Sequence, residues 1–554
     1  MKKKRSGKGK LGSARDSVEQ PAMFQADSEE YLLEEGSVES GSAYKKRPAF
    51  KAYAQSQRML FPPSYEEMVP ENHPVRVVSS VIDRISLENL YGAYHGGGAS
   101  SYDPRMLLKV IVYAYVRNIY SSRKIEEALR ENVHFMWLSG GTVADHNTIA
   151  RFRSSRLKDG IKEVFVEVVK LLHAEGYVDL KSIVTDGTKF EANANRHKIV
   201  WAKRVKRYRE SIEKQIREVA EYAARGDGDD DPNLPDFEDI DAEKLEKVVE
   251  DLNTRLKGKD VPREVKGKFE RVRAKGPERL RRYEEQERIL DGRTSYSVTD
   301  KDATAMRQKD DHMRTAPLKP SYNVQFSTEG HMVTNYTVGQ EHTDTTALIP
   351  HMDDWRKCYG SMPESVTADA GYGSEANYQY MEDNGIEAFV KHNFFDKENK
   401  GWEPDRFTAA AFGCDAETGT VICPIGKPMV LIGTRTEKTE GGHEKTLHRY
   451  RAEGCRECPL RDSCITRGDR RRNRVIEISL NSRRLRKKAG ELLETDVGIG
   501  KRKERYKVEA VIGNLKHNKN FRRFLLRGIE KVAAEIGILS IANNLSRLAT
   551  LQTA

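Results

Sequence analysis

Two aspartates lie in similar local sequence contexts. Each follows a short apolar segment with strand character and precedes a glycine within two residues, in Val184-Thr185-Asp186-Gly187 and Val366-Thr367-Ala368-Asp369-Ala370-Gly371. A carboxylate at the end of a buried strand projects into the crevice where α/β sheets bind ligands. Either aspartate alone would more simply be a turn or helix-cap residue, but two such strands in one chain predict a shared site.

A third carboxylate is expected on a helix late in the chain. Arg502, Arg505, Glu509 and Lys516 are spaced by three, four and seven residues, so at about 100° per residue they share one helix face. The adjoining stripe is apolar: Val508, Val511, Ile512 and Leu515. Such a helix would pack this stripe on a sheet and direct Glu509 into the crevice. A surface helix with i, i+4 ion pairs has the same pattern, so the helix alone leaves both interpretations open.

Four cysteines form a second group with the spacing of metal ligands. Cys423, Cys455, Cys458 and Cys464 read C-x31-C-x2-C-x5-C, which suits a tetrahedral structural Zn²⁺. The alternative is four reduced cysteines without a metal. A redox pair at Cys455 and Cys458 is less favoured because the flanking helix–strand context is missing. The other two cysteines, Cys358 and Cys414, are expected to be structural.

The segments that must position these residues predict a mixed α/β sheet with helices on its faces. Strands are expected at 182–185, 365–368 and 387–390, a hairpin at 322–328 and 332–337, and helices at 345–357 and 375–383. Upstream, the pattern is mostly helical, with helices that begin at Pro104, Ser122 and near Asp145 or Asn147, similar to a helix-turn-helix bundle.

These patterns divide the chain into five parts. Residues 1–50 are expected to be a disordered basic tail, and 51–165 an N-terminal helical DNA-binding domain. Residues 166–196, 296–391 and 481–554 would form the catalytic core. The highly charged segment 197–295 predicts two long helices in a coiled-coil-like insertion, with an acidic break near Asp227–Asp236. Residues 392–480 predict a strand-and-loop insertion with the cysteine cluster.

Composition narrows the class of partner. Lys and Arg number 95 against 85 Asp and Glu, a net charge of +10, and the basic residues concentrate at Met1–Arg5 and Arg483–Arg527. Such blocks favour a polyanion such as nucleic acid, although any single basic run is more simply solvated surface. No run of about 18 apolar residues and no secretory signal pattern occurs, so we expect no membrane contact and a cytosolic location.

Together the motifs resemble those of DDE transposases from bacterial insertion sequences, over roughly Met59 to Leu548. The segment 184–194 resembles the family's first-Asp segment, Ser321-Tyr322-Asn323-Val324-Gln325 its Tyr-Asn-Val-Gln strand, and 367–373 its second-Asp segment. The signature around the family's Glu reads Tyr-x2-Arg-x3-Glu-x6-Lys. Here Arg505, Glu509 and Lys516 match, while Arg502 stands in place of Tyr, which puts a stacking or hydroxyl role at that position in doubt.

The resemblance implies a ribonuclease H-like catalytic core and cut-and-paste transposition in the bacterial cytosol, at the nucleoid. Two divalent cations, Mg²⁺ or Mn²⁺, about 3.5–4 Å apart would be bound by carboxylate oxygens. Asp186 would bridge both ions, and Asp369 and Glu509 would each complete one. Water would attack for cutting and the freed 3′-hydroxyl for joining, with no covalent protein intermediate.

Double-stranded DNA is the expected partner, as terminal inverted repeats and as target. The candidate phosphate-binding residues are Arg502, Arg505, Lys516, Arg522, Arg523 and Arg527. A homodimer assembled on two DNA ends is expected because one crevice acts on one end at a time.

Two alternatives remain at this point. Another ribonuclease H-like nuclease would have the same carboxylates, although the two large insertions disfavour it. An inactive DNA-binding regulator would explain the helical bundle, the cysteines and the coiled coil, but it gives no reason for three carboxylates at these positions.

Overall fold

The computed structural model describes residues 63–92, 94, 101–226, 237–308, 315–415, 418–439, 441–465 and 473–553. The expected basic tail at 1–50 and the acidic break at 227–236 lie outside the described residues. The description below concerns the compact unit that begins at Pro63. None of its described helices is both long and apolar enough to cross a membrane.

A six-stranded mixed sheet forms the centre of this unit. Its strands are β1 (Ser182–Glu191), β4 (Thr304–Arg307), β5 (Leu318–Glu329), β6 (Met332–Gly339), β7 (Ser365–Ala368) and β8 (Glu387–Val390). The order is β4-β5-β1-β7-β8, and β6 also pairs with β5. Strand β1 is antiparallel to β5 and parallel to β7, which is parallel to β8. The predicted mixed α/β sheet is confirmed.

The hairpin of β5 and β6 follows from its turn residues. Glu329 pairs with Met332, and Gly330 between them has a φ of 60°, a backbone conformation that glycine adopts without steric cost. Alternate residues of β5, Tyr322, Val324 and Phe326, are fully buried. They therefore form the apolar face on which helices pack.

Two groups of helices cover the sheet. The first contains α8 (Leu157–Ala174) and α19 (Ile529–Thr553), which pack in one core with β5, β6 and Phe190 of β1. The second contains α12 (Leu348–Tyr359), α13 (Glu375–Asp383) and α16 (Leu480–Glu494), packed with Ile183 of β1 and Val366 of β7. Residue 183 is odd-numbered and residue 190 even-numbered on the same strand. Their side chains therefore point to opposite faces of the sheet.

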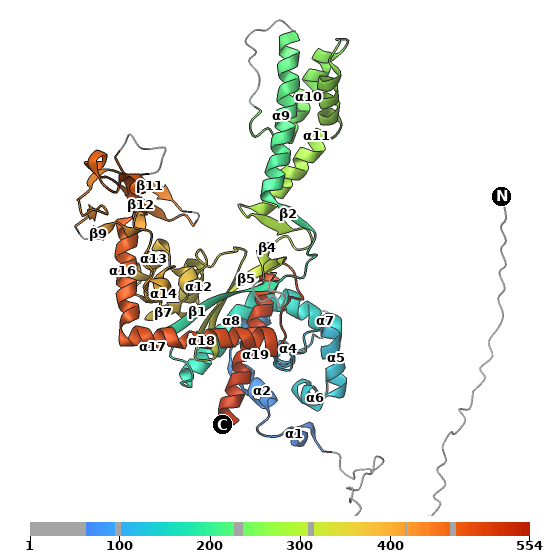
Figure 1. Cartoon of the computed structure of the whole chain (residues 1–554). Helices are drawn as coiled ribbons and strands as arrows, with labels where there is room; N and C mark the ends of the chain where they lie inside the picture. Colours follow the sequence, from blue (N-terminus) through green and yellow to red (C-terminus); the bar gives the residue numbers. More distant parts are fainter. Residues whose placement is uncertain are drawn as a thin grey trace, which may run out of the picture. The chain divides into compact units, whose positions relative to one another are not determined.

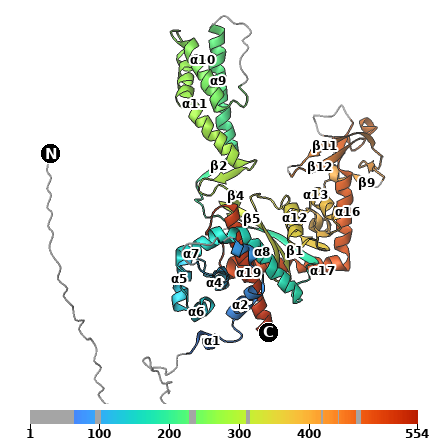
Figure 2. The same ribbon diagram turned by 180° about the vertical axis from the view of Figure 1, so that it is seen from behind.

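The N-terminal helices are α1 (Tyr65–Met68), α2 (Pro74–Arg84), α3 (Glu88–Gly92), α4 (Pro104–Val116), α5 (Ser122–Glu131), α6 (Val133–Ser139) and α7 (His146–Arg151), followed by a π-helical turn at Phe152–Arg156. The three predicted helix starts are confirmed, and Asp103 and Asp145 are the N-caps of α4 and α7. Helices α2 and α4 lie beside α19 in both views, and they share its hydrophobic core (Figures 1 and 2).

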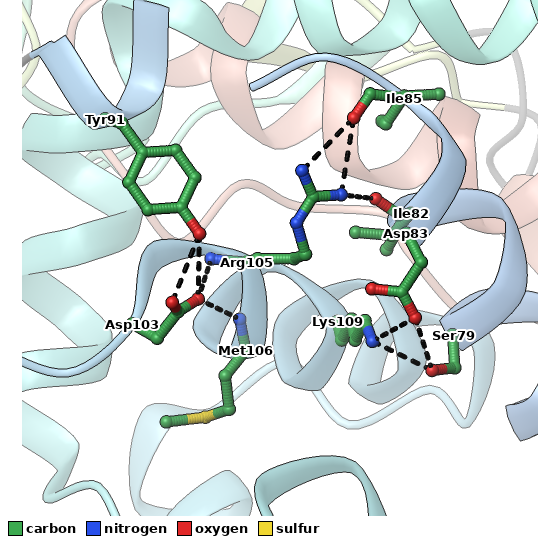
Figure 3. A network of polar contacts seen from close by, with 9 residues as sticks. All are labelled: Ser79, Ile82, Asp83, Ile85, Tyr91, Asp103, Arg105, Met106 and Lys109. Carbon is green, nitrogen blue, oxygen red and sulfur yellow. Dashed lines mark hydrogen bonds and ion pairs between the residues drawn. The ribbon is translucent and has the colours of Figure 1, made fainter. Parts of the chain in front are cut away.

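Polar contacts join α2 to α4 (Figure 3). The Arg105 guanidinium donates to the carbonyls of Ile82 and Ile85, which lie at the C-terminal end of α2. Lys109 Nζ lies 2.5 Å from an Asp83 carboxylate oxygen. The Arg105 contacts satisfy helix-end carbonyls that have no partner within the helix.

The charged segment after β2 (Ile199–Trp201) contains three described helices where two were predicted. They are α9 (Ala202–Gly226), α10 (Ala242–Leu256) and α11 (Arg263–Leu290), and β3 (Ser295–Ser297) returns to pair with β2. Leu245 and Leu252 of α10 are buried in a separate core with residues of α9 and α11, so the predicted pair becomes a three-helix bundle (Figures 1 and 2).

The cysteine-bearing segment is built of short strands, as predicted. They are β9 (Gly413–Asp415), β10 (Thr420–Ile422), β11 (Val430–Lys438), β12 (Glu444–Arg451) and β13 (Val475–Ile478), with short helices at Phe395–Glu398 (α14) and Arg461–Cys464 (α15). Strands β11, β12 and β13 form an antiparallel sheet. A small core of its own contains Phe412, Val421, Tyr450 and Ile476.

The late basic helix is interrupted, which corrects the prediction that it is continuous. Helix α17 (Asp496–Glu504) ends before Arg505, α18 (Tyr506–Gly513) follows, and Asn514–Asn518 form a π-helical turn. Arg502 and Lys516 therefore do not share one straight helix face with Glu509. A π-turn changes the residue periodicity and is frequent at functional sites.

Candidate active site

The two aspartates predicted to share a site come together on neighbouring strands. Ser182–Val184 of β1 pair with Ser365–Thr367 of β7 in parallel, and Asp369 follows the last residue of β7. Asp186 lies within β1 and not at its end, which corrects the predicted strand boundary. Strand β1 continues because β5 pairs with it as far as Glu191. Among the described strands, none pairs with β1 on the β7 side beyond Val184, so this edge is open at Asp186.

Each aspartate is oriented through one carboxylate oxygen. The Gly187 N–H donates to Asp186 Oδ1 at 2.8 Å, and the Gly371 N–H donates to Asp369 Oδ1 at 2.7 Å. Asp369 is also the N-cap of a 3₁₀ turn, Ala370–Tyr372. The glycines after the two aspartates thus supply backbone N–H groups that fix the carboxylates and leave Oδ2 of each available.

Burial and neighbouring negative charges perturb the Asp186 carboxylate at this edge of the sheet. Burial raises the pKa of Asp186 to about 7, and the negative charges of Asp369 and, more weakly, Asp344 add to the effect. Positive Arg505 opposes the rise. A buried carboxylate next to other carboxylates is stabilised by a bound cation, and oxygen donors of this kind suit Mg²⁺ or Mn²⁺.

Glu509 faces the same cavity from α18. The cavity has a volume of about 290 Å³ and is lined by Asp186, Asp344, Glu509 and Lys516 among others. Helix α18 contacts β1 and β5, with Val508 and Val511 buried on its inner side. Glu509 forms an ion pair with Arg505 at 2.7 Å. Within the described ranges, no three His, Cys, Asp or Glu side chains are arranged to hold a metal ion, so Glu509 would have to turn from Arg505 to join the aspartates.

The predicted phosphate-binding residues fall in three places. Lys516 lines the cavity, where its Nζ donates to Thr188 Oγ1 at 2.5 Å and lies 5.1 Å from the Phe190 ring centroid. The Arg502 guanidinium instead lies 5.2 Å from the ring centroid of Phe395. Of the other four, Arg505 pairs with Glu509. Arg522, Arg523 and Arg527 donate to backbone carbonyls, those of Lys516, Ala192, Ala194 and Asn193.

Sequence reasoning missed Asp344. Its Oδ1 accepts hydrogen bonds from Asn323 Nδ2 at 2.9 Å and Gln325 Nε2 at 3.2 Å. The Tyr372 hydroxyl donates to Gln325 Oε1, which extends the chain of hydrogen bonds to the second-Asp segment. Asp344 follows no strand and precedes no glycine, so the pattern that drew attention to Asp186 and Asp369 could not find it. The only signal was the polar Asn and Gln at alternate positions of a buried strand.

The four cysteines of the predicted zinc site lie around one small cavity. Cys423, Cys455, Cys458 and Cys464 line a volume of about 30 Å³ together with apolar residues such as Phe412 and Ile465. All four thiols are free. Burial raises the pKa of Cys464, and the other three thiols of this set raise it further. The described thiols are not arranged as metal ligands, so binding of an ion would require rotation of their side chains.

Two segments of the chain match known families. Residues 63–155 match the family described as a transposase domain (DUF772), and residues 422–549 match the family described as a transposase DDE domain. No curated protein and no solved structure matches the chain. The first match spans α1 to α7, and the second includes Glu509 and the four cysteines, whereas Asp186 and Asp369 lie outside both.

These matches support the class of transposases. In agreement with the family resemblance of the motifs, they support a DDE-type transposase of an insertion sequence.

Proposed function

We propose that this transposase moves its element by cut-and-paste transposition, with Asp186, Asp369 and Glu509 as the metal ligands of a ribonuclease H-like core. The observation that carries the proposal is the placement of Asp186 on β1 and of Asp369 directly after β7, two adjacent parallel strands, with α18 in contact with β1. The raised pKa of Asp186 supports a site that is completed by cations.

Each residue has a separate task in this proposal. Asp186, Asp369 and Glu509 would hold two Mg²⁺ or Mn²⁺ ions, with Asp186 as the ligand that the two ions share. The bound ions would activate the attacking oxygen and stabilise charge on the leaving oxygen. When Glu509 turns toward the aspartates it releases Arg505, whose guanidinium then becomes available for a DNA phosphate. Lys516, which lines the cavity, would contact a phosphate.

We assign DNA-end recognition to the N-terminal helical domain, 51–165, and to the basic C-terminal helices. The terminal inverted repeats bind there, and target DNA enters the same open cavity. Two chains assemble on two ends, with the helical insertion 197–295 as the bridging element. The other parts of the chain are the insertion 392–480 and the catalytic core. The core is built from segments 166–196, 296–391 and 481–554. We expect the protein to act at the nucleoid in the bacterial cytosol, where its DNA substrate would lie.

We also propose a structural Zn²⁺ bound by Cys423, Cys455, Cys458 and Cys464. The support is their convergence on one small apolar cavity within a locally folded segment. Thiolates suit zinc and are poor ligands for Mg²⁺, so this site would be separate from catalysis.

A strand-transfer assay tests the proposed function. The purified full-length chain is incubated with a fragment that carries the element's end, with supercoiled target plasmid and with Mg²⁺. We expect cleavage at the end and covalent joining of the freed 3′ end to the plasmid. A nuclease would cut without joining, and an inactive regulator would bind without metal-dependent cleavage. Either result would overturn the proposal.

A further inference from the structure

Asp344 reaches the proposed cation site from the opposite face of β1. It lies in the loop between β6 and α12 and contacts Asn323 and Gln325, which are odd-numbered residues of β5 and point to one face of the sheet. Asp186 is an even-numbered residue of β1, and its side chain points to the other face. Both side chains nevertheless line the same cavity, and β1 has no described partner on the β7 side at this point.

The space beside Gly187 is filled by this carboxylate. A Cβ atom at Gly187 would lie 2.6 Å from Asp344 Oδ1 and 2.5 Å from Gln325 Nε2, closer than packed atoms allow. At Gly371 a Cβ atom would lie 3.9 Å from the Asp344 Cβ. Asp344 therefore lies between the glycines that follow the two aspartates, and a side chain at Gly187 would displace it.

The loop that carries Asp344 is fixed to the loop that carries Asp369. Thr345 Oγ1 donates to the Gly371 carbonyl at 2.9 Å, and Asn377 Nδ2 donates to the carbonyls of Thr345 and Tyr372 at 2.9 and 2.8 Å. These bonds set the position of the Asp344 backbone relative to the second aspartate.

All three aspartates share one pattern of hydrogen bonding. Oδ1 of each accepts from N–H groups, whereas Oδ2 accepts no hydrogen bond from any residue within the described ranges. Metal-binding carboxylates are oriented in this way by surrounding hydrogen-bond donors. A carboxylate can only accept hydrogen bonds. The side-chain amides of Asn323 and Gln325 must therefore turn their NH₂ groups toward Asp344.

Asn323 gives an independent indication of a ligand. Its side chain is 2% exposed and lines the cavity, and its Oδ1 has no hydrogen-bond partner among the described residues. A buried amide oxygen without a partner costs about 1–3 kcal/mol. Amide carbonyls are good ligands for hard cations or for the waters bound to them.

We propose that Asp344 is a fourth carboxylate of the cation site, binding through Oδ2, and that Asn323 and Gln325 are the positioning residues that orient it. The proposal rests on the proposed function and adds a ligand to its site. It explains why a buried strand carries two amides, why Gly187 has no side chain, and why the loop before α12 is bonded to the second-Asp loop.

Binding of Mn²⁺ to the full-length protein without DNA tests this proposal, measured by electron paramagnetic resonance. We expect Asp344→Asn to weaken Mn²⁺ affinity by about 10–100-fold. The matched control is Glu341→Gln, an exposed carboxylate in the same loop, which should bind Mn²⁺ as the wild type does. An affinity of Asp344→Asn equal to that of the wild type would overturn the proposal.

Asn323→Ala provides a second variant, which keeps the carboxylate and removes one of its two donors. We expect about a 10-fold weaker affinity, by the same argument from ligand orientation. If Asp344→Asn does not fold, Asn323→Ala tests the proposal in its place. Unchanged Mn²⁺ binding by Asn323→Ala would then overturn the proposal. Asp186→Asn separates the two claims: if the wild type and Asp186→Asn bind Mn²⁺ equally, the proposed metal site itself is wrong.

Discussion

The carboxylate cavity and the cysteine cavity are assembled in different ways. Asp186 of β1, Asp344 of the loop before α12 and Glu509 of α18 are distant in sequence and line one cavity in the folded chain. Asp369, in the turn after β7, does not line it, but its charge raises the pKa of Asp186. The four cysteines come from one segment with a small core of its own. The carboxylate cavity measures about 290 Å³ and the cysteine cavity about 30 Å³.

This difference indicates different functions. The carboxylates repel one another, and the cavity around them has room for a phosphodiester and contains the cationic Lys516. The cysteines surround a mostly apolar pocket that is too small for a substrate. A site held open by distant elements favours catalysis, and a closed local cluster favours a structural role.

The largest expected effect is loss of DNA cleavage when one of the three proposed ligands loses its charge. Asp186→Asn, Asp369→Asn and Glu509→Gln keep the shape of the side chain but remove the charge that a hard cation needs. We expect each to lower cleavage at least about 10²–10³-fold, while folding and end binding persist. Near-normal cleavage by one variant, measured on an end fragment in Mg²⁺, would remove that residue from the site.

A mutation in the cysteine cavity should affect zinc binding there without directly affecting the carboxylate site. Cys455→Ser is expected to abolish binding of about one zinc per chain and to destabilise the segment built on β11, β12 and β13. Elemental analysis and limited proteolysis report the two effects. Absence of zinc from wild-type protein prepared without chelators would rule out the metal. Direct loss of Mn²⁺ binding at the carboxylates in this variant would contradict the separation of the two sites.

A smaller effect concerns the stability of the metal-free protein at different pH values. The pKa of Asp186 is about 7 in the folded chain and near 3.8 in the unfolded chain. The native state therefore binds this proton more tightly, so stability should fall as pH rises from about 4 to 7. Urea unfolding in chelator should show this fall in the wild type and a weaker one in Asp186→Asn. Parallel pH profiles would contradict the raised pKa.

The sequence predicted the carboxylates better than it predicted their surroundings. Strand periodicity and the following glycines identified Asp186 and Asp369, because a buried strand with a terminal polar residue is a local pattern. The strand boundary at Asp186 was wrong because pairing with β5 extends β1 to Glu191. Asp344 and the interrupted helix depend on tertiary contacts and on a π-turn, and no local pattern encodes either.

The smallest expected effect is on the salt dependence of DNA binding. Arg505→Ala and Lys516→Ala should each lower the log–log slope of affinity against salt by about one unit, because each removes one phosphate contact. Lys438→Ala, on β11 of the cysteine-bearing segment and paired with Glu444 at 3.3 Å, is the control. Unchanged slopes for both the Arg505 and the Lys516 variants would show that these side chains do not contact phosphate.

Manganese located by anomalous diffraction tests the central claim most directly. Crystals of the wild-type chain grown with Mn²⁺ are expected to show two peaks about 3.5–4 Å apart at the open edge of β1, both in contact with Asp186. Asp369 and Glu509 should each contact one of them. Peaks elsewhere in the molecule, or none beside Asp186, would contradict the assignment of this cavity as the catalytic metal site.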